Sequence, residues 1–420
     1  MNYNRYINIL LILFAFAFPI SIAAANIILG IMLVLWILEG DFKNKLSKIK
    51  KNDIFIIFAL IVFTLFISTL FSPEYNQGFQ INNRIDNQFE FLKRFVWIGS
   101  FYIIYITSAQ KNTAIKMVNS FLIAMFINEL ISYSIYFKII DKKLLLTLKD
   151  MHLMHKLASS INPSPMNHSF YSLYLALTII LLLYKLLNSK NSIYLKIGMF
   201  FFTLSALTNL FINAGRTGQL AIILGLIVFF ITYIKNKKAL FLIIIITLII
   251  PIIAYKMSPN FKRRVDTSLY TYKLIQKNNY CSSWGERVGM VKTSFDYLTA
   301  NAKNFILGAG NGIAKREYLN FTKQHYPNIY KCIKHERTLH NQYLQLWIDG
   351  GIFALILMLY LLNALLKKNR QNFYLNSALV TIFAFSFISD VMIYYSKTLI
   401  LFLFILIVIQ YYKEGNYEKI

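Results

Sequence analysis

The sequence predicts an all-α fold, a polytopic integral membrane bundle of about 12 transmembrane helices. Hydrophobic residues make up 57% of the chain and charged residues 15%, whereas soluble domains contain about 25% charged residues. The mean hydropathy is +0.52, and apolar runs recur along almost the whole length. These runs are continuously apolar, whereas the strands of a membrane barrel alternate in polarity, so helices are expected.

A hydrocarbon core of about 30 Å is crossed by about 20 helical residues, and this length defines the expected spans. The first two are short and meet at Pro19. We expect an uncleaved anchor there rather than a cleaved signal peptide, because the apolar run continues past three alanines as far as Leu38. In order, the expected spans are 5–19, 20–38, 54–72, 91–108, 115–137, 168–187, 194–212, 216–234, 239–256, 340–366, 372–390 and 394–412.

The spans divide the chain into three parts. Residues 1–256 hold the first nine spans, 257–339 form a large loop expected to contain short helices, and 340–420 hold the last three spans and a tail. Lysines cluster in short connections such as 43–51 and 235–238, and such clusters mark cytoplasmic loops. Both termini are therefore expected in the cytoplasm, with the large loop on the outer side.

The net charge of +26 divides between the two sides of the membrane. From Lys256 to Arg337 the large loop holds 15 lysines and arginines against five acidic residues. Such a surface is either simply solvated or gathers an anionic head group. Membrane lipids are the expected partner of the cytoplasmic lysines. We expect no nucleic-acid partner, because no recognition motif accompanies this charge.

Both cysteines, Cys281 and Cys332, lie in the large loop. An oxidising compartment would permit a disulfide. The sequence alone does not bring the two residues together, so we favour two free thiols and keep the disulfide as the alternative. His152 and His155 have a spacing that could bind a metal, but no cysteine or carboxylate completes the set, and we expect no metal site.

Two arginines are candidates for binding phosphate oxygens. Arg216 begins a span at the outer surface, where free amide groups and the positive end of the helix dipole add to its guanidinium group. The alternative is an arginine that reaches lipid head groups. Arg287 lies in the large loop, on a stretch expected to form an amphipathic helix that ends before Gly308. Its alternative is an ion pair with a nearby carboxylate.

His340 is the candidate base, expected at the outer start of a span with Asn341 beside it. An imidazole pKa near ~6.5 suits proton transfer at neutral pH. Gly351, eleven residues later, would lie on nearly the same helix face, and its small size would let a neighbouring helix approach. Asp390 ends the eleventh span. It could orient His340, pair with an arginine or be a solvated helix end.

These elements resemble the O-antigen ligase and polymerase superfamily. The resemblance covers about 205–400 by motif and the whole chain by the number of spans. Ala354 stands where the ligase branch usually has Gly, Thr or Tyr. The shared motifs are Arg216-Thr217-Gly218 at a helix start, Gly285-Glu286-Arg287 and Gly308-Ala309-Gly310-Asn311-Gly312 in the large loop, and His340-Asn341-x9-Gly351, which is most like the ligases.

The resemblance implies a metal-independent, inverting glycosyltransferase of the C type without a cofactor. Its donor would be a glycan on undecaprenyl pyrophosphate, and its acceptor a sugar hydroxyl of lipid A–core in lipopolysaccharide biosynthesis. The enzyme would lie in the bacterial inner membrane, with its active site and large loop in the periplasm. Arg216 and Arg287 would bind the pyrophosphate and His340 would take the hydroxyl proton, supported by Asp390 and Asn341.

Two alternatives stay open. A polymerase or a protein O-oligosaccharyltransferase of the same superfamily would differ only in the acceptor. A lipid-linked sugar flippase or transporter would explain Glu129 within a span, since membrane-buried acids often serve transport. We favour it less, because a flippase needs no large outer loop. The sequence leaves the sugar, the acceptor and the oligomeric state undetermined.

Overall fold

The computed structural model is almost entirely helical. It describes residues 3–71, 79–81, 84–86, 90–140, 163–311 and 314–413. Among these residues the only strands are β1 (Phe79–Ile81) and β2 (Arg84–Asp86), which form one short antiparallel pair. The prediction of an all-α membrane fold is confirmed. His152 and His155, the histidine pair considered for metal, lie outside the described residues.

Helices occupy all twelve expected membrane spans. They are α1 (Tyr3–Ile20), α2 (Ile22–Glu39), α4 (Asp53–Leu70), α5 (Glu90–Ser108), α6 (Thr113–Tyr136), α8 (His168–Asn188), α9 (Ile193–Ile212), α10 (Arg216–Tyr233), α11 (Lys237–Met257), α17 (Gln342–Lys367), α18 (Phe373–Ser389) and α19 (Ser396–Tyr411). In the described part of the chain, ten helices are long and apolar enough to cross a membrane. The other two expected spans are α5 and α19, the latter 16 residues long.

The remaining helices are short or polar. A basic helix, α3 (Phe42–Lys50), follows α2, and a 3-10 turn (Arg370–Asn372) precedes α18. The large loop folds into α12 (Pro259–Gln276), α13 (Ser283–Thr299), α14 (Ala302–Leu307), α15 (Ala314–His325) and α16 (Pro327–Ile333). The loop was expected to contain short helices, and it does. Ser258 and Ser282 cap α12 and α13, because each side chain accepts a bond from a free amide of the first turn.

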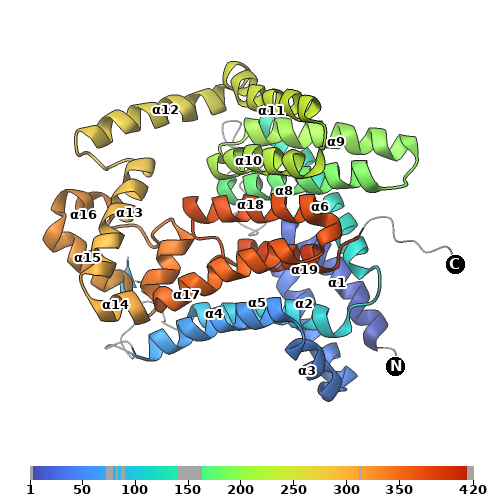
Figure 1. Cartoon of the computed structure of the whole chain (residues 1–420), viewed down its shortest axis with the longest axis horizontal. Coiled ribbons are helices and arrows are strands. Elements are labelled where there is room, and N and C mark those ends of the chain that lie inside the picture. Colours follow the sequence, from blue (N-terminus) through green and yellow to red (C-terminus); the bar gives the residue numbers. More distant parts are fainter. Residues whose placement is uncertain are drawn as a thin grey trace.

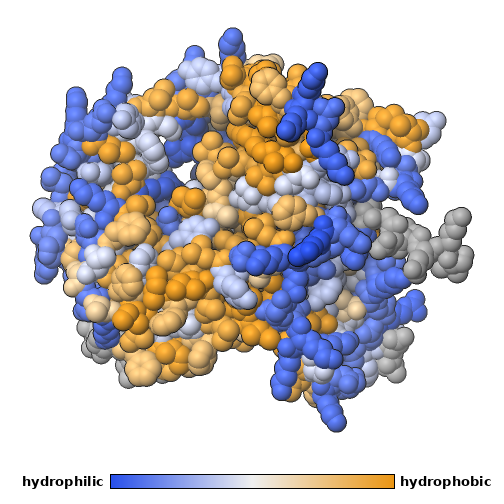
Figure 2. Space-filling view, viewed as in Figure 1, coloured by the Kyte–Doolittle hydropathy of each residue, from blue (hydrophilic) through white to orange (hydrophobic). Residues whose placement is uncertain are grey.

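The long helices lie side by side, and the large loop covers one end of the bundle (Figure 1). The start of α1 and the end of α19 lie toward the opposite end, near α3 (Figure 1). Figure 2 shows a hydrophobic middle between two hydrophilic ends on the visible face. This distribution is the one expected for a helical bundle that crosses a bilayer with polar regions in water on both sides.

The centre of the bundle is formed by α8 and α19. Every residue of α19 from Thr398 to Ile409 is buried. By contrast, only Thr247 and Ala254 of α11 are buried, so α11 is placed to face lipid. Around the centre, α17 packs on α4, and α18 packs on α10. The last pair matters for the site, because it brings the start of α10 beside the end of α18.

The large loop has a hydrophobic core of its own. Met290, Leu298 and Tyr318 are among its buried members. A disulfide joins Cys281, just before α13, to Cys332 in α16, with their Cα atoms 4.8 Å apart. Our preference for two free thiols was therefore wrong. The folding of α13 and α16 onto one core brings the cysteines together, and their spacing of 51 residues carries no sign of this.

Candidate active site

A cavity of about 810 Å³ opens where α10, α12, α13 and α18 meet. Its size lies in the usual range of ligand sites, about 300–1,000 Å³. One wall is cationic and another is apolar. The cationic residues include Arg216, Arg264 and Arg287, and the apolar ones include Phe385 and Ile388. The cavity therefore suits a ligand with an anionic part joined to an apolar part.

Arg216 is the first residue of α10, as predicted. Its terminal nitrogens donate to the hydroxyl groups of Ser268 at 3.3 Å and Ser283 at 3.2 Å. The start of α10 lies tightly against α8, since a Cβ at Gly218 would come within 2.2 Å of the Ser172 backbone. Glycine is therefore required two residues after the arginine. Both partners of Arg216 are neutral, so they position the guanidinium group without balancing its charge.

Two further guanidinium groups complete the cationic wall. Arg287 donates to the backbone carbonyls of Ser283 at 2.7 Å and Ser389 at 3.1 Å. Arg264, from α12, has a buried Nε without a hydrogen-bond partner among the described residues. Arg264 was not predicted from the sequence, where its only signal is the basic run 262–264. Three arginines on one cavity suit phosphate oxygens, which accept the paired N–H groups of a guanidinium fork.

His340 lies just before α17, not within it. The helix begins at Gln342, and Asn341 caps it by accepting a bond from the Leu344 amide at 3.1 Å. The expected start of the helix at His340 was therefore wrong by two residues. His340 has a φ of 49°, a left-handed conformation uncommon for residues other than glycine. Asn341 lines the arginine cavity, which places the histidine at its edge.

The imidazole of His340 is held between two carboxylates. Its Nδ1 lies 3.0 Å from Oδ1 of Asp390, at the end of α18. Its Nε2 lies 2.9 Å from Oε2 of Glu336, four residues earlier in the chain. Of the three roles considered for Asp390, orienting the histidine agrees with this contact. Glu336 was missed, although its spacing of four residues was visible.

The two carboxylates decide the charge of His340. Burial lowers the pKa of the imidazole, but the hydrogen bonds with Asp390 and Glu336 outweigh burial and raise the pKa to about 9. Burial raises the pKa of Asp390, yet His340 outweighs this effect and the pKa is lowered. The hydrogen bond with His340 likewise lowers the pKa of Glu336. At neutral pH His340 is thus an imidazolium that donates from both nitrogens.

Gly351 breaks α17 instead of continuing it. Its φ is 73°, so the expectation that it shares a face with His340 along an unbroken helix was wrong. The close approach expected at this glycine is present. A Cβ on Gly351 would lie 2.0 Å from the Ile306 carbonyl oxygen. The glycine turn is docked there, because the amide of Ala309 donates to the Ile348 carbonyl at 2.8 Å.

A buried carboxylate joins the segments around the histidine. Asp349 accepts bonds from Asn311 at 3.1 Å and Tyr394 at 2.7 Å. It also accepts two bonds from Gln345, whose own oxygen accepts from the Leu339 amide at 3.0 Å. Leu339 immediately precedes the histidine. This network was not predicted from the sequence, because its members lie up to 83 residues apart and carry no common motif.

A family model described as O-antigen ligase matches residues 201–359. The chain carries a domain of the O-antigen ligase superfamily. This domain runs from α9 into α17 and includes the three arginines and His340. Asp390 lies beyond the matched residues and reaches the site through the packing of α18. A search of the curated proteins finds no match.

The apolar helices and the O-antigen ligase domain both indicate a multi-pass membrane protein. The family implies a glycosyltransferase-like activity, either ligase or related polymerase. It implies, in general terms, a lipid-linked glycan and a lipid acceptor as partners. The arginine cavity and the histidine site lie in, or directly beside, this domain.

Proposed function

We propose that the protein is an O-antigen ligase, which transfers a glycan from undecaprenyl pyrophosphate to a sugar hydroxyl of lipid A–core. One observation carries the proposal: three arginines on one cavity lie beside the His340–Asp390 pair. A pyrophosphate leaving group requires positioned cations. A sugar hydroxyl requires a base to remove its proton. The site contains both kinds of group.

An apolar groove supports a lipid-linked donor. It lies between α17 and α18, has a volume of about 420 Å³, and includes Tyr343 and Leu366. It shares Phe385 and Ile388 with the arginine cavity. We propose that the polyprenyl chain occupies this groove while its pyrophosphate binds the guanidinium groups. A water-soluble nucleotide sugar would leave the groove without a use.

In the proposed reaction, the acceptor oxygen attacks the anomeric carbon as the bond to the pyrophosphate breaks, so the configuration inverts. The hydroxyl proton passes to Nε2 of the neutral form of His340. Asp390 accepts the hydrogen bond from Nδ1 and stabilises the imidazolium that forms. Arg216 and Arg287 stabilise the charge that develops on the leaving pyrophosphate, and Arg264 adds a third cation. We propose that this transfer is metal-independent and of the C type.

We propose that the site faces the periplasm from the bacterial inner membrane. The cavity lies at the end covered by α12 to α16, and the start of α1 and the end of α19 lie toward the other end (Figure 1). The basic helix α3 also lies near that other end. Because positive short loops stay in the cytoplasm, this arrangement supports cytoplasmic termini and a periplasmic unit formed by 257–339.

The acceptor separates the ligase from its alternatives. Membranes that contain the protein would be supplied with a defined undecaprenyl-pyrophosphate-linked glycan and one of three acceptors: lipid A–core, carrier-linked glycan or protein. We expect transfer to lipid A–core alone, and none with His340→Ala. Extension of the carrier-linked glycan would identify a polymerase, and transfer to protein would identify an oligosaccharyltransferase. Transfer to none of the three acceptors would refute the proposed glycosyltransferase activity.

A further inference from the structure

The Glu336 carboxylate is hydrogen-bonded to one of the two imidazole nitrogens that His340 would use in the proposed reaction. Asp390 engages Nδ1, which leaves Nε2 as the position that would meet the acceptor hydroxyl. In the structure, however, the Glu336 carboxylate is bonded to that same nitrogen at 2.9 Å. If the proposed function holds, the carboxylate and the acceptor compete for one atom.

The contact with Glu336 also depends on the protonation of His340. An imidazole whose single proton is on Nδ1 presents a lone pair at Nε2. A carboxylate oxygen also presents lone pairs and has no proton to donate. The two atoms attract each other at this distance only when Nε2 carries a proton. Contact with Glu336 and readiness to accept a proton therefore exclude each other.

We propose that Glu336 is a positioning residue that occupies the place of the acceptor hydroxyl in the resting site. It withdraws from His340 before each transfer. Once the carboxylate has withdrawn, the proton on Nε2 passes directly to water, which leaves His340 neutral. The side chain of Glu336 is 34% exposed, so water reaches it. The acceptor hydroxyl then takes the vacated position and gives its own proton to Nε2.

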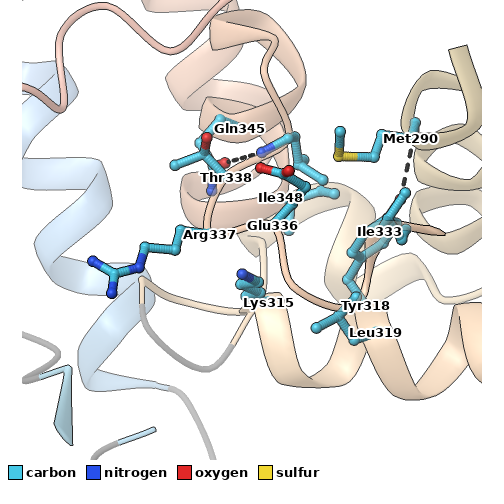
Figure 3. A pocket seen from close by; sticks show the side chains of 11 residues that line it. Met290, Lys315, Tyr318, Leu319, Ile333, Glu336, Arg337, Thr338, Gln345 and Ile348 are labelled. Carbon is cyan, nitrogen blue, oxygen red and sulfur yellow. Dashed lines mark hydrogen bonds between the residues drawn. The ribbon is translucent and has the colours of Figure 1, made fainter. Parts of the chain in front are cut away.

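The withdrawn Glu336 side chain would lie beside Lys315. Its side chain lines a small pocket of about 10 Å³ together with Lys315 of α15 (Figure 3). The positive charge of Lys315 lowers the pKa of Glu336. Glu336 belongs to the connection between α16 and α17, where its own amide donates to the Ile333 carbonyl at 2.9 Å, so the movement involves its side chain and not its backbone. A turn of this side chain toward Lys315 would release Nε2.

Several charged groups face this pair from the neighbouring elements. Arg287 of α13 lowers the pKa of His340. Glu286, also on α13, has a pKa raised by burial and by Glu336. The other titratable neighbours are Asp390 and Tyr395 after α18, Arg337 in the connection, and Lys315 on α15. The carboxylates prevail, and the pKa of His340 is about 9.

This charge state makes the inference measurable without any substrate. Diethyl pyrocarbonate acylates neutral imidazole and spares imidazolium. The full-length protein in detergent would be treated over pH 6 to 10, and acylation of the His340 peptide followed by mass spectrometry. For the wild type we expect half-maximal reactivity near pH 9. For Glu336→Gln we expect the midpoint to fall by about one unit or more, because an amide no longer stabilises the proton.

Matched variants show whether the lower midpoint comes from the contact with Glu336 or from the loss of any negative charge in the large loop. Glu317→Gln removes the same charge from α15, where the carboxylate accepts a bond from Tyr297 at 3.0 Å. We expect it to leave the midpoint near the wild-type value. Glu336→Asp keeps the charge on a shorter side chain and should give an intermediate midpoint, which covers the case that the amide variant does not fold. An unchanged midpoint in both Glu336 variants would overturn the inference.

A rate measurement tests the exchange with the acceptor. With undecaprenyl-pyrophosphate-linked glycan and lipid A–core, Glu336→Gln should transfer at pH 7 at least as fast as the wild type, and its acid limb should move to lower pH. A loss of ~100-fold that is not recovered at pH 9 would make Glu336 a proton acceptor in its own right, against our proposal. A third outcome is that the acylation midpoint shifts in Glu336→Gln while neither the wild type nor the variant transfers glycan. That result would refute the proposed function but would still support the contact between Glu336 and His340.

Discussion

Nδ1 of His340 lies 3.0 Å from Oδ1 of Asp390, although the two residues are separated by 50 positions, one just before α17 and the other at the end of α18. The Asp390 oxygen also accepts a bond from the Val391 amide at 2.8 Å. The carboxylate is therefore fixed before it meets the imidazole. This geometry assigns the Nδ1 proton to the contact with Asp390, and the acceptor hydroxyl can meet Nε2 only after Glu336 has withdrawn.

Asp390→Asn tests the orienting contact. An asparagine amide can present either its oxygen or its NH2 group to Nδ1, so it no longer fixes the tautomer with a negative charge. We expect kcat to fall by ~10²–10⁴-fold with little change in donor binding, as when the partner of a catalytic histidine is lost. His340→Ala should fall as far. If Asp390→Asn kept normal activity while His340→Ala was inactive, Asp390 would have no orienting role and would only end α18.

The pH profile of the wild type follows from the raised pKa of His340. Because the pKa is about 9, the neutral base becomes more abundant as pH rises. We expect kcat/KM to increase about tenfold per unit from pH 7 and to level off near pH 9. The effect of pH on folding stability has the opposite direction. Because the pKa of His340 is raised in the folded protein, its protonation stabilises the fold fully below about pH 6.5, and this stabilisation is lost as pH rises through 9. A flat rate between pH 7 and 9 would contradict His340 as the base.

Arg216→Lys should be a poor replacement. Lysine keeps the charge, but it loses the planar fork that can hold two phosphate oxygens. We expect turnover at limiting donor to fall by about 10- to 100-fold, the usual worth of one to two charged hydrogen bonds. Normal turnover would instead support an arginine that only contacts lipid head groups.

Arg264→Lys tests the third guanidinium group, whose Nε is buried and has no partner among the described residues. We expect a similar loss at limiting donor. The neighbouring Arg263 is exposed and lies outside the cavity lining, so Arg263→Lys is a matched control and should be near normal. Equal behaviour of the two variants would remove Arg264 from the site.

The disulfide should stabilise the large loop more than the membrane helices. Cys281 and Cys332 close a long loop of chain, and such bonds contribute about 2–4 kcal/mol. The double variant to serine should therefore unfold α12 to α16 at lower temperature or denaturant concentration. Limited proteolysis of the loop, with and without reductant, would measure this. Identical cleavage in both conditions would show that the bond does not support the loop.

Reporter fusions test the orientation. Alkaline phosphatase is active only outside the cytoplasm, so fusion after Asn304 in α14 should give high activity. Fusion after Lys237, at the start of α11, should give low activity. The opposite pattern would place the arginine cavity in the cytoplasm and exclude the periplasmic ligase.

The sequence by itself determined the class of fold and the location of the helices. Helix formation across a membrane is local, because each span needs only about 20 successive apolar residues. The same is true of Arg216 at the start of α10, which is marked by a polar break followed by glycine. The start of α17 was predicted less well. It was expected at His340 but lies two residues later, because the side chain of Asn341 caps the helix.

Only the tertiary structure decided the contents of the site. Arg264 reaches the cavity because α12 folds over the start of α10, and Cys281 meets Cys332 because α13 and α16 share a core. The charge of His340 depends on carboxylates from two separate segments and on burial, and none of these is a property of the local sequence. A pKa is set by whatever lies within a few ångströms. In this chain those neighbours are assembled by packing between helices far apart in the sequence.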